Sequence, residues 1–272
     1  MSTTDQLVAD IQQHRCYTHP VFQDWAVNRP APDAIAALFH QIQMFCASTR
    51  PGWNFPDALA KHDLLRESEL FNEIIESEAD HGPELARMAG FIVNQASCER
   101  VYPDIYNQAD VEARLKEQSD RILGSLPGYS RDDGLTIQTR RAIAVFGRRK
   151  LTDVEATYRN LGTALALEMI SNNHLIPGEK ECLVDSGAYS ASLDQPEMHY
   201  LLEHWGEAGA EQQHEKNAVT AVSSVLNDES GPLIRQGTME FLDSLAALWD
   251  VLDSALLQSG SPRAIPENSA EQ

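Results

Sequence analysis

The spacing of the apolar residues is the feature that most limits the folds open to this chain. They recur every three or four residues along most of its length. In the segment 33–49 this spacing puts near one face Ile35, Leu38, Phe39, Ile42 and Phe45. That is the period of an α-helix with one buried side. Few segments alternate β-branched and polar residues as strands do, so the sequence predicts an all-α protein.

Capping and helix-breaking residues divide the chain into seven or eight predicted helices. The main helical segments are 33–49, 64–95, 110–124, 136–149, 153–176, 196–226 and 233–257. Gly82-Pro83 is expected to break or kink the second segment, and Pro177-Gly178 to end the fifth. Connections of modest length favour a compact bundle over an extended solenoid.

The length and composition of the chain favour one domain. A chain of 272 residues with 42% apolar residues can bury a sizeable core, so residues 1–258 are expected to form a single helical domain. Residues 259–272 are rich in Ser, Pro, Glu and Gln, which predicts a disordered C-terminal tail. The irregular region 97–134 is expected either to cover a pocket or to form a subunit contact. The second alternative would allow a homodimer.

The charge of the chain excludes two classes of partner. Lys and Arg number 21 against 41 Asp and Glu, a formal charge of −20 that phosphate backbones and anionic lipid surfaces would repel. We therefore expect no nucleic-acid partner and no membrane association. No stretch approaches about 20 apolar residues, and the first thirteen residues do not resemble a secretory signal, so a cytoplasmic location is expected.

The segment 196–226 carries the densest set of groups that can bind a metal. His204, Glu207, Glu211 and His214 follow one another at steps of three, four and three. On one continuous helix these steps would place two carboxylates and two imidazoles on one side. The alternative is a solvated acidic stripe, which is common in a protein of this charge.

Two further positions add potential ligands. Glu78 and His81 have the i, i+3 spacing that helical-bundle carboxylate metal sites use, although Glu73, Glu76 or Asp80 could replace Glu78. Glu168 stands alone in a strongly apolar stretch, where burial without a cation or donor would be costly; it could instead point outward. Carboxylates and imidazoles without thiolates suit non-haem iron or manganese better than structural zinc.

The order of these groups resembles that of the haem-oxygenase-like diiron oxidases. The resemblance covers roughly residues 19–226 and rests on His19-Pro20-Val21-Phe22, Asn72-Glu73-Ile74-Ile75-Glu76, His81-Gly82, Glu168, Glu207, Glu211 and His214. Members of that family carry a Glu and a His on an early helix, a Glu on a middle helix and His-x-x-x-Asp-x-x-His on a late helix. Glu207 stands where the first late His is expected, so either Glu207 or His204 would be the ligand.

The resemblance implies a seven-helix haem-oxygenase-like fold that binds two Fe(II) per chain and uses O2 as co-substrate. The short Glu78-x-x-His81 spacing is similar to that of the alkene-forming fatty-acid decarboxylase of this family, and p-aminobenzoate synthase is another relative. Such an enzyme would oxidise a small carboxylate-bearing metabolite, a fatty acid or an amino acid. The implied ligands of one iron are Glu78, His81 and His214, and those of the other are Glu207, Glu211 and Glu168, the last as a bridge or second-site ligand.

Two arginines and two rival functions complete the sequence-based hypotheses. Arg140 and Arg141 could pair with a substrate carboxylate, or could lie on the surface. The first rival function is a metal-free oxidase or thiaminase-like enzyme with the same fold, in which Glu and His act as acid and base. The second is a non-enzymatic acidic helical protein that binds a basic partner.

Overall fold

The protein folds into α-helices, as the spacing of its apolar residues predicts. The computed structural model describes residues 3–50, 52, 54–77, 81–206 and 209–257. Within these ranges there are thirteen α-helices and no β-strand. The helices are α1 (Thr3–Gln13), α2 (Val21–Asn28), α3 (Pro32–Thr49), α4 (Asn54–Lys61), α5 (Leu65–Ser77), α6 (His81–Ala96), α7 (Gln108–Ile122), α8 (Ile137–Phe146), α9 (Val154–Ile170), α10 (Ile176–Lys180), α11 (His199–His204), α12 (Ala210–Val225) and α13 (Gly231–Leu252).

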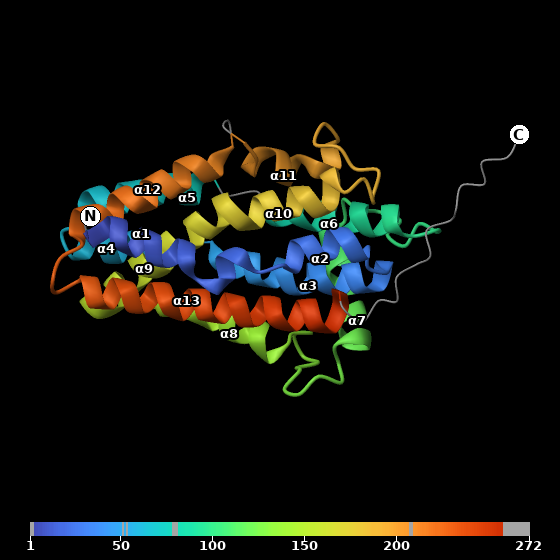
Figure 1. Cartoon of the computed structure of the whole chain (residues 1–272), viewed down its shortest axis with the longest axis horizontal. Coiled ribbons are helices and arrows are strands. Elements are labelled where there is room, and N and C mark those ends of the chain that lie inside the picture. Colours follow the sequence, from blue (N-terminus) through green and yellow to red (C-terminus); the bar gives the residue numbers. More distant parts are fainter. Residues whose placement is uncertain (1–2, 51, 53, 78–80, 207–208, 258–272) are drawn as a thin grey trace, which may run out of the picture.

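Most of the long helices run along the long axis of the molecule (Figure 1). One continuous cluster of buried apolar side chains extends from Leu7 to Leu257. Helix α3 packs against α6, α7 and α8, whereas α9 packs against α12 and α13. Their polypeptide segments lie far apart in the sequence, so side chains from distant parts of the chain meet in the interior.

Helices α9 and α13 are in close contact through small residues. The Thr238 hydroxyl donates to the Gly162 carbonyl at 3.0 Å, and the Thr163 hydroxyl donates to the Gly237 carbonyl at 3.2 Å. A Cβ atom added at Gly162 would lie 1.9 Å from the Ile234 carbonyl oxygen. The two glycines therefore let the backbones approach more closely than any other residue would allow.

The segment 64–95 forms two helices, as predicted, but the boundary is not where we expected it. Helix α5 ends at Ser77 and α6 begins at His81. Gly82 and Pro83 lie in the first turn of α6, where a proline needs no hydrogen-bonded N–H. Glu78 lies outside the described residues, so its pairing with His81 stays a prediction.

The prediction that Pro177-Gly178 ends the helix beginning near residue 153 is wrong. A π-helical turn at Ser171–Leu175 follows α9, and the chain continues as α10 and then as a second π-helical turn at Glu181–Asp185. Proline normally clashes with the carbonyl four residues before it. The wider turn just before Pro177 makes room for the ring, because its hydrogen bonds reach back five residues.

The segment 196–226 is not one helix. It divides into a 3-10 turn at Pro196–Met198, then α11, then α12. After α11 ends at His204, Gly206 adopts a left-handed conformation with φ +83°, and Gly209 precedes α12 in an extended conformation. These glycines break the helical path. His204 and Glu211 therefore lie on different helices, and Glu207 lies outside the described residues.

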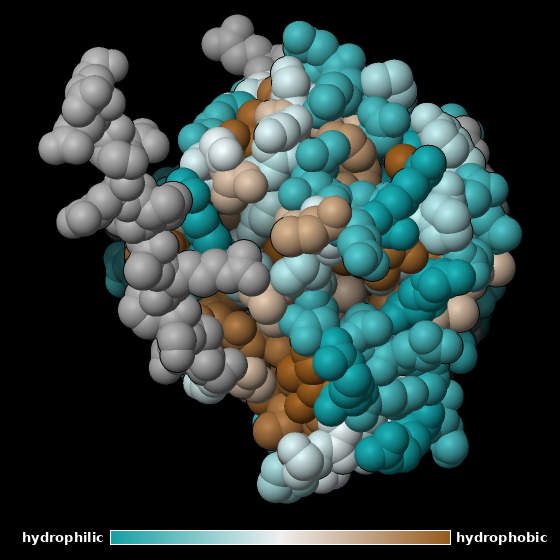
Figure 2. Space-filling view, turned by 90° about the vertical axis from the view of Figure 1, so that its right-hand side faces the viewer, coloured by the Kyte–Doolittle hydropathy of each residue, from teal (hydrophilic) through white to brown (hydrophobic). Residues whose placement is uncertain are grey.

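The outer surface carries much of the charge. Figure 2 shows a face that is hydrophilic over most of its area, with apolar side chains gathered in its lower part and a few more between the polar ones. In the part of the chain that the structure covers, every helix is too short or too polar to cross a lipid bilayer. Residues 259–272, the predicted tail, lie outside the described part.

Candidate metal centre

Three buried side chains from two helices meet in the interior. Glu168 is on α9, and Glu211 and His214 are on α12. Each is at most 5% exposed, and one ligand atom from each lies within 4.8 Å of those of the other two. His214 Nδ1 lies 3.7 Å from Glu168 Oε2. We call Glu168, Glu211 and His214 the Glu/His cluster.

His204 approaches this cluster from α11. Its Nε2 atom lies 3.7 Å from Glu211 Oε1, and its Nδ1 atom lies 2.6 Å from the carbonyl oxygen of Tyr200. A carbonyl oxygen can only accept a hydrogen bond, so Nδ1 carries the proton. In the neutral ring Nε2 then presents its lone pair toward the carboxylate. Histidines that bind metals are oriented in this way by a backbone carbonyl behind the ring.

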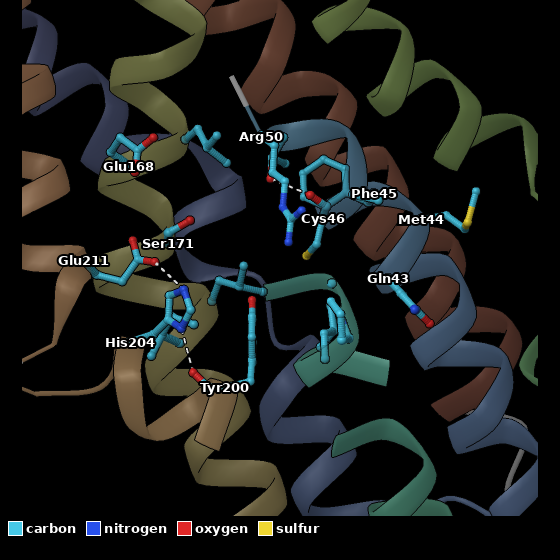
Figure 3. A pocket seen from close by; sticks show the side chains of 18 of the residues that line it. Gln43, Met44, Phe45, Cys46, Arg50, Glu168, Ser171, Tyr200, His204 and Glu211 are labelled. Carbon is cyan, nitrogen blue, oxygen red and sulfur yellow. Dashed lines mark hydrogen bonds and ion pairs between the residues drawn. The ribbon is translucent and has the colours of Figure 1, made fainter. Parts of the chain in front are cut away.

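A cavity of about 240 Å³ borders the cluster. Glu168, Glu211 and His204 line it together with Ser171 and Tyr200 on one side. Figure 3 shows these side chains facing a space whose other side is formed by Phe45 and Cys46 of α3 and by Arg50, which follows that helix. Part of the irregular region reaches the same space, since Gln108 and Glu112 on α7 also line it. A small molecule held there would lie beside the Glu/His cluster.

A second group of possible ligands lies nearer the surface. Glu84 Oε1 is 2.9 Å from His199 Nδ1, and Glu203 Oε1 is 3.6 Å from His199 Nε2. Both nitrogens of His199 thus face a carboxylate already, and Glu203 is exposed. Surface groups of this kind are common without a metal, so the buried cluster is the stronger candidate.

The structure brings together half of the six predicted metal ligands. Glu168, Glu211 and His214 meet as described, and His204, the alternative to Glu207, lies beside them. Glu78 and Glu207 are outside the described residues. His81 is the first residue of α6, but its side chain is outside the described part. Their predicted roles remain predictions.

The two predicted substrate-binding arginines lie elsewhere. Arg140 and Arg141 on α8 are exposed, and neither lines the cavity. Arg140 donates to the Gly128 carbonyl at 2.6 Å. The arginine that does line the cavity is Arg50, which sequence reasoning missed. It lies just beyond the last residue of α3, where an arginine is normally solvated, so neither its residue type nor its position in the sequence marked it as a lining residue.

Glu179 is a buried carboxyl group that sequence reasoning also missed. It lies on α10, is 1% exposed, and has no hydrogen-bond partner for either oxygen among the described residues. Burial raises its pKa to about 8. The folded protein therefore keeps a proton that the unfolded chain releases above its ordinary pKa near 4.5, so stability is lost as the pH rises between these two values.

Glu179→Gln is expected to remove this loss. Each pH unit between the two pKa values is worth about 1.4 kcal/mol, so the variant should gain on the order of 3 kcal/mol relative to the natural protein between pH 5 and 8. Urea unfolding across this pH range measures the difference. The matched control is Glu181→Gln, an exposed position two residues away. Parallel pH curves for Glu179→Gln and the natural protein would contradict the prediction.

Comparisons with known proteins do not assign this chain to a family. No family model, no curated protein and no solved structure matches this chain. The resemblance to the haem-oxygenase-like diiron oxidases therefore rests on the residues quoted for it.

Proposed function

We propose that this protein is a non-haem iron enzyme that uses O2 to oxidise a small organic substrate. The observation that supports this most is the Glu/His cluster, with His204 beside it, at the wall of an internal cavity. Two buried carboxylates and two imidazoles are an oxygen and nitrogen donor set that suits iron.

The environment of the cluster favours a bound cation. Glu168 and Glu211 are both buried, and two carboxylates that close together repel each other unless a positive charge lies near them. The orientation of His204 points the same way, since its Nε2 lone pair faces Glu211. A cation between these groups would relieve both repulsions.

In the proposed centre, Glu168, Glu211, His214 and His204 would hold one ferrous ion. A second ion would also need the other predicted ligands, Glu78, His81 and Glu207. Bound ferrous iron supplies the binding and reduction of O2. The chain itself contributes the orientation of His204 by the Tyr200 carbonyl, and apolar side chains on the cavity wall that include Leu85, Leu167, Leu175 and Ile176.

Anaerobic titration of the metal-free protein with Fe(II), followed by O2, tests this proposal. We expect about two iron ions per chain, as the two-metal resemblance implies, and a transient visible absorbance after mixing with O2. A protein that stays colourless and binds no iron would overturn it. Substrate turnover that survives complete removal of metal would instead favour acid–base catalysis by the carboxylate–imidazole pairs.

A further inference from the structure

Arg50 is a charged side chain that extends into the cavity. It follows the last residue of α3 and lines the cavity. Its Nη2 atom is buried and has no hydrogen-bond partner among the described residues. A buried charged donor without an acceptor is costly. The cost is removed if a ligand supplies the acceptor.

The surroundings of Arg50 leave room for such a ligand. Figure 3 shows its side chain extending from the end of α3 into the space that separates Cys46 from Glu211 and His204. On the other side lies Gly82, where an added Cβ would be 3.4 Å from Nη2. The Nη2 atom of the guanidinium thus packs against a residue without a side chain, and the Arg50 side chain also borders the cavity.

Glu112, an acidic residue on the cavity wall, already has hydrogen-bond partners. Glu112 Oε1 accepts hydrogen bonds from the amides of Gln43 and Gln108, each at 2.8 Å. No ion pair joins Glu112 to Arg50 among the described residues. The charge of Arg50 is therefore not neutralised by Glu112.

Two other arginines with buried guanidinium atoms make contacts away from the cavity wall. Arg149 donates to the Thr49 carbonyl and stacks over the rings of Phe146 and Phe55, at 4.7 and 5.8 Å. Arg87 lies 4.7 Å over the ring of Tyr106. Neither of them lines the cavity, whereas Arg50 does. Arg50 is therefore the arginine placed to meet a ligand there.

We propose that Arg50 binds the carboxylate of a small organic acid and so selects the substrate of the centre described above. As a substrate site this rests on the proposed function. A guanidinium and a carboxylate match as planar groups. A single guanidinium in a cavity that also holds Glu168 and Glu211 favours a monoanion over a doubly charged phosphate. The rest of the acid would lie against the apolar wall, toward Glu211 and His204.

Calorimetric titration of the metal-free protein with hexanoate, hexanamide and inorganic phosphate tests the proposal. The natural protein should bind hexanoate at least about 10-fold more tightly than neutral hexanamide, since a charged hydrogen bond is lost with the amide. Arg50→Gln should weaken hexanoate binding by about 10-fold or more. Arg50→Lys, which keeps the charge but not the planar fork, should fall between them.

Several results would overturn the proposal. One is equal affinity of the natural protein for hexanoate and hexanamide. Another is a loss of hexanoate affinity in Arg140→Gln but not in Arg50→Gln. The third is tighter binding of phosphate than of hexanoate. Arg66→Gln, at an exposed position on α5, is the control for removing one positive charge. The comparison of hexanoate with hexanamide uses the natural protein only, so it stands even if a variant misfolds.

Iron affinity measured in parallel separates this proposal from the proposed function. If the natural protein binds hexanoate through Arg50 but no iron, the oxygen chemistry fails and the carboxylate site stands. If it binds iron but does not distinguish hexanoate from hexanamide, the carboxylate site fails and the metal centre stands.

Discussion

Glu211→Gln is expected to lower the affinity for Fe(II) by at least about 100-fold, because it removes a ligand that sits in the middle of the cluster. Loss of a residue that only supports a ligand costs about 10- to 100-fold in metal affinity. Glu211 has more than a supporting role in the proposed centre: it shares the cluster with Glu168 and His214, and it faces His204 at 3.7 Å.

The same substitution should not destabilise the metal-free protein. Glutamine keeps the size of the side chain and removes one of two buried negative charges, so the thermal midpoint without metal should equal or exceed that of the natural protein. Ferrous iron at 100 times its dissociation constant should stabilise the natural protein by about 2.7 kcal/mol. Glu211→Gln should show almost none of this gain.

The matched control is Glu215→Gln on the same helix. Glu215 also joins α12 to the π-helical turn after α9, through hydrogen bonds from Asn172 and Asn173, but it lies outside the cluster. We expect this variant to keep its iron affinity. Equal iron binding by Glu211→Gln and Glu215→Gln, measured by anaerobic titration, would argue against the proposed centre.

Gly162→Ala is expected to destabilise the fold by about 3 kcal/mol or more, through overpacking between α9 and α13. The new Cβ would lie 1.9 Å from the Ile234 carbonyl oxygen and 2.9 Å from the Thr238 hydroxyl oxygen. Both neighbours are fixed, the first in the backbone of α13 and the second by its hydrogen bonds. The helices must therefore separate, with loss of packing along their contact.

Urea unfolding measures this effect, and Gly147→Ala is the control. Gly147 has helical dihedral angles, φ −57° and ψ −25°, and an added Cβ would meet nothing within 4 Å. The same chemical change there should be neutral or stabilise the protein by up to about 1 kcal/mol. If the free energy of unfolding of Gly162→Ala lies within about 1 kcal/mol of that of the natural protein, the close approach of α9 and α13 is contradicted.

Much of the helical structure could be predicted from the sequence because helix formation depends on local spacing. The segment from Ile35 to Phe45 repeats its apolar residues at helical period and forms α3, and Asp153 caps α9 with its side chain as expected. The described residues form thirteen α-helices rather than the predicted seven or eight, because α1, α2 and α4 lie in segments for which no helix was predicted. Other errors fall where the outcome depends on the path of the backbone. A π-helical turn admits Pro177, and the left-handed Gly206 ends the path that would have carried α11 into α12.

The candidate site, too, could be predicted only in part. Glu168 could be singled out because a lone carboxylate in an apolar helix needs a partner if it is buried. Arg50 could not, because an arginine at the end of a helix is normally solvated. Only its position beside the cavity reveals that its Nη2 atom is buried without a partner.

The sequence by itself determined the all-α class, the main helical segments and the chemical nature of the groups in the candidate centre, since these follow from residue type and short-range spacing. Tertiary structure alone decided which groups meet. The spacing of His204 and Glu211 suggested one helix face, yet the chain breaks between them and they meet across two helices. Their contact depends on how α9, α11 and α12 pack, and packing depends on interactions between residues far apart in the chain.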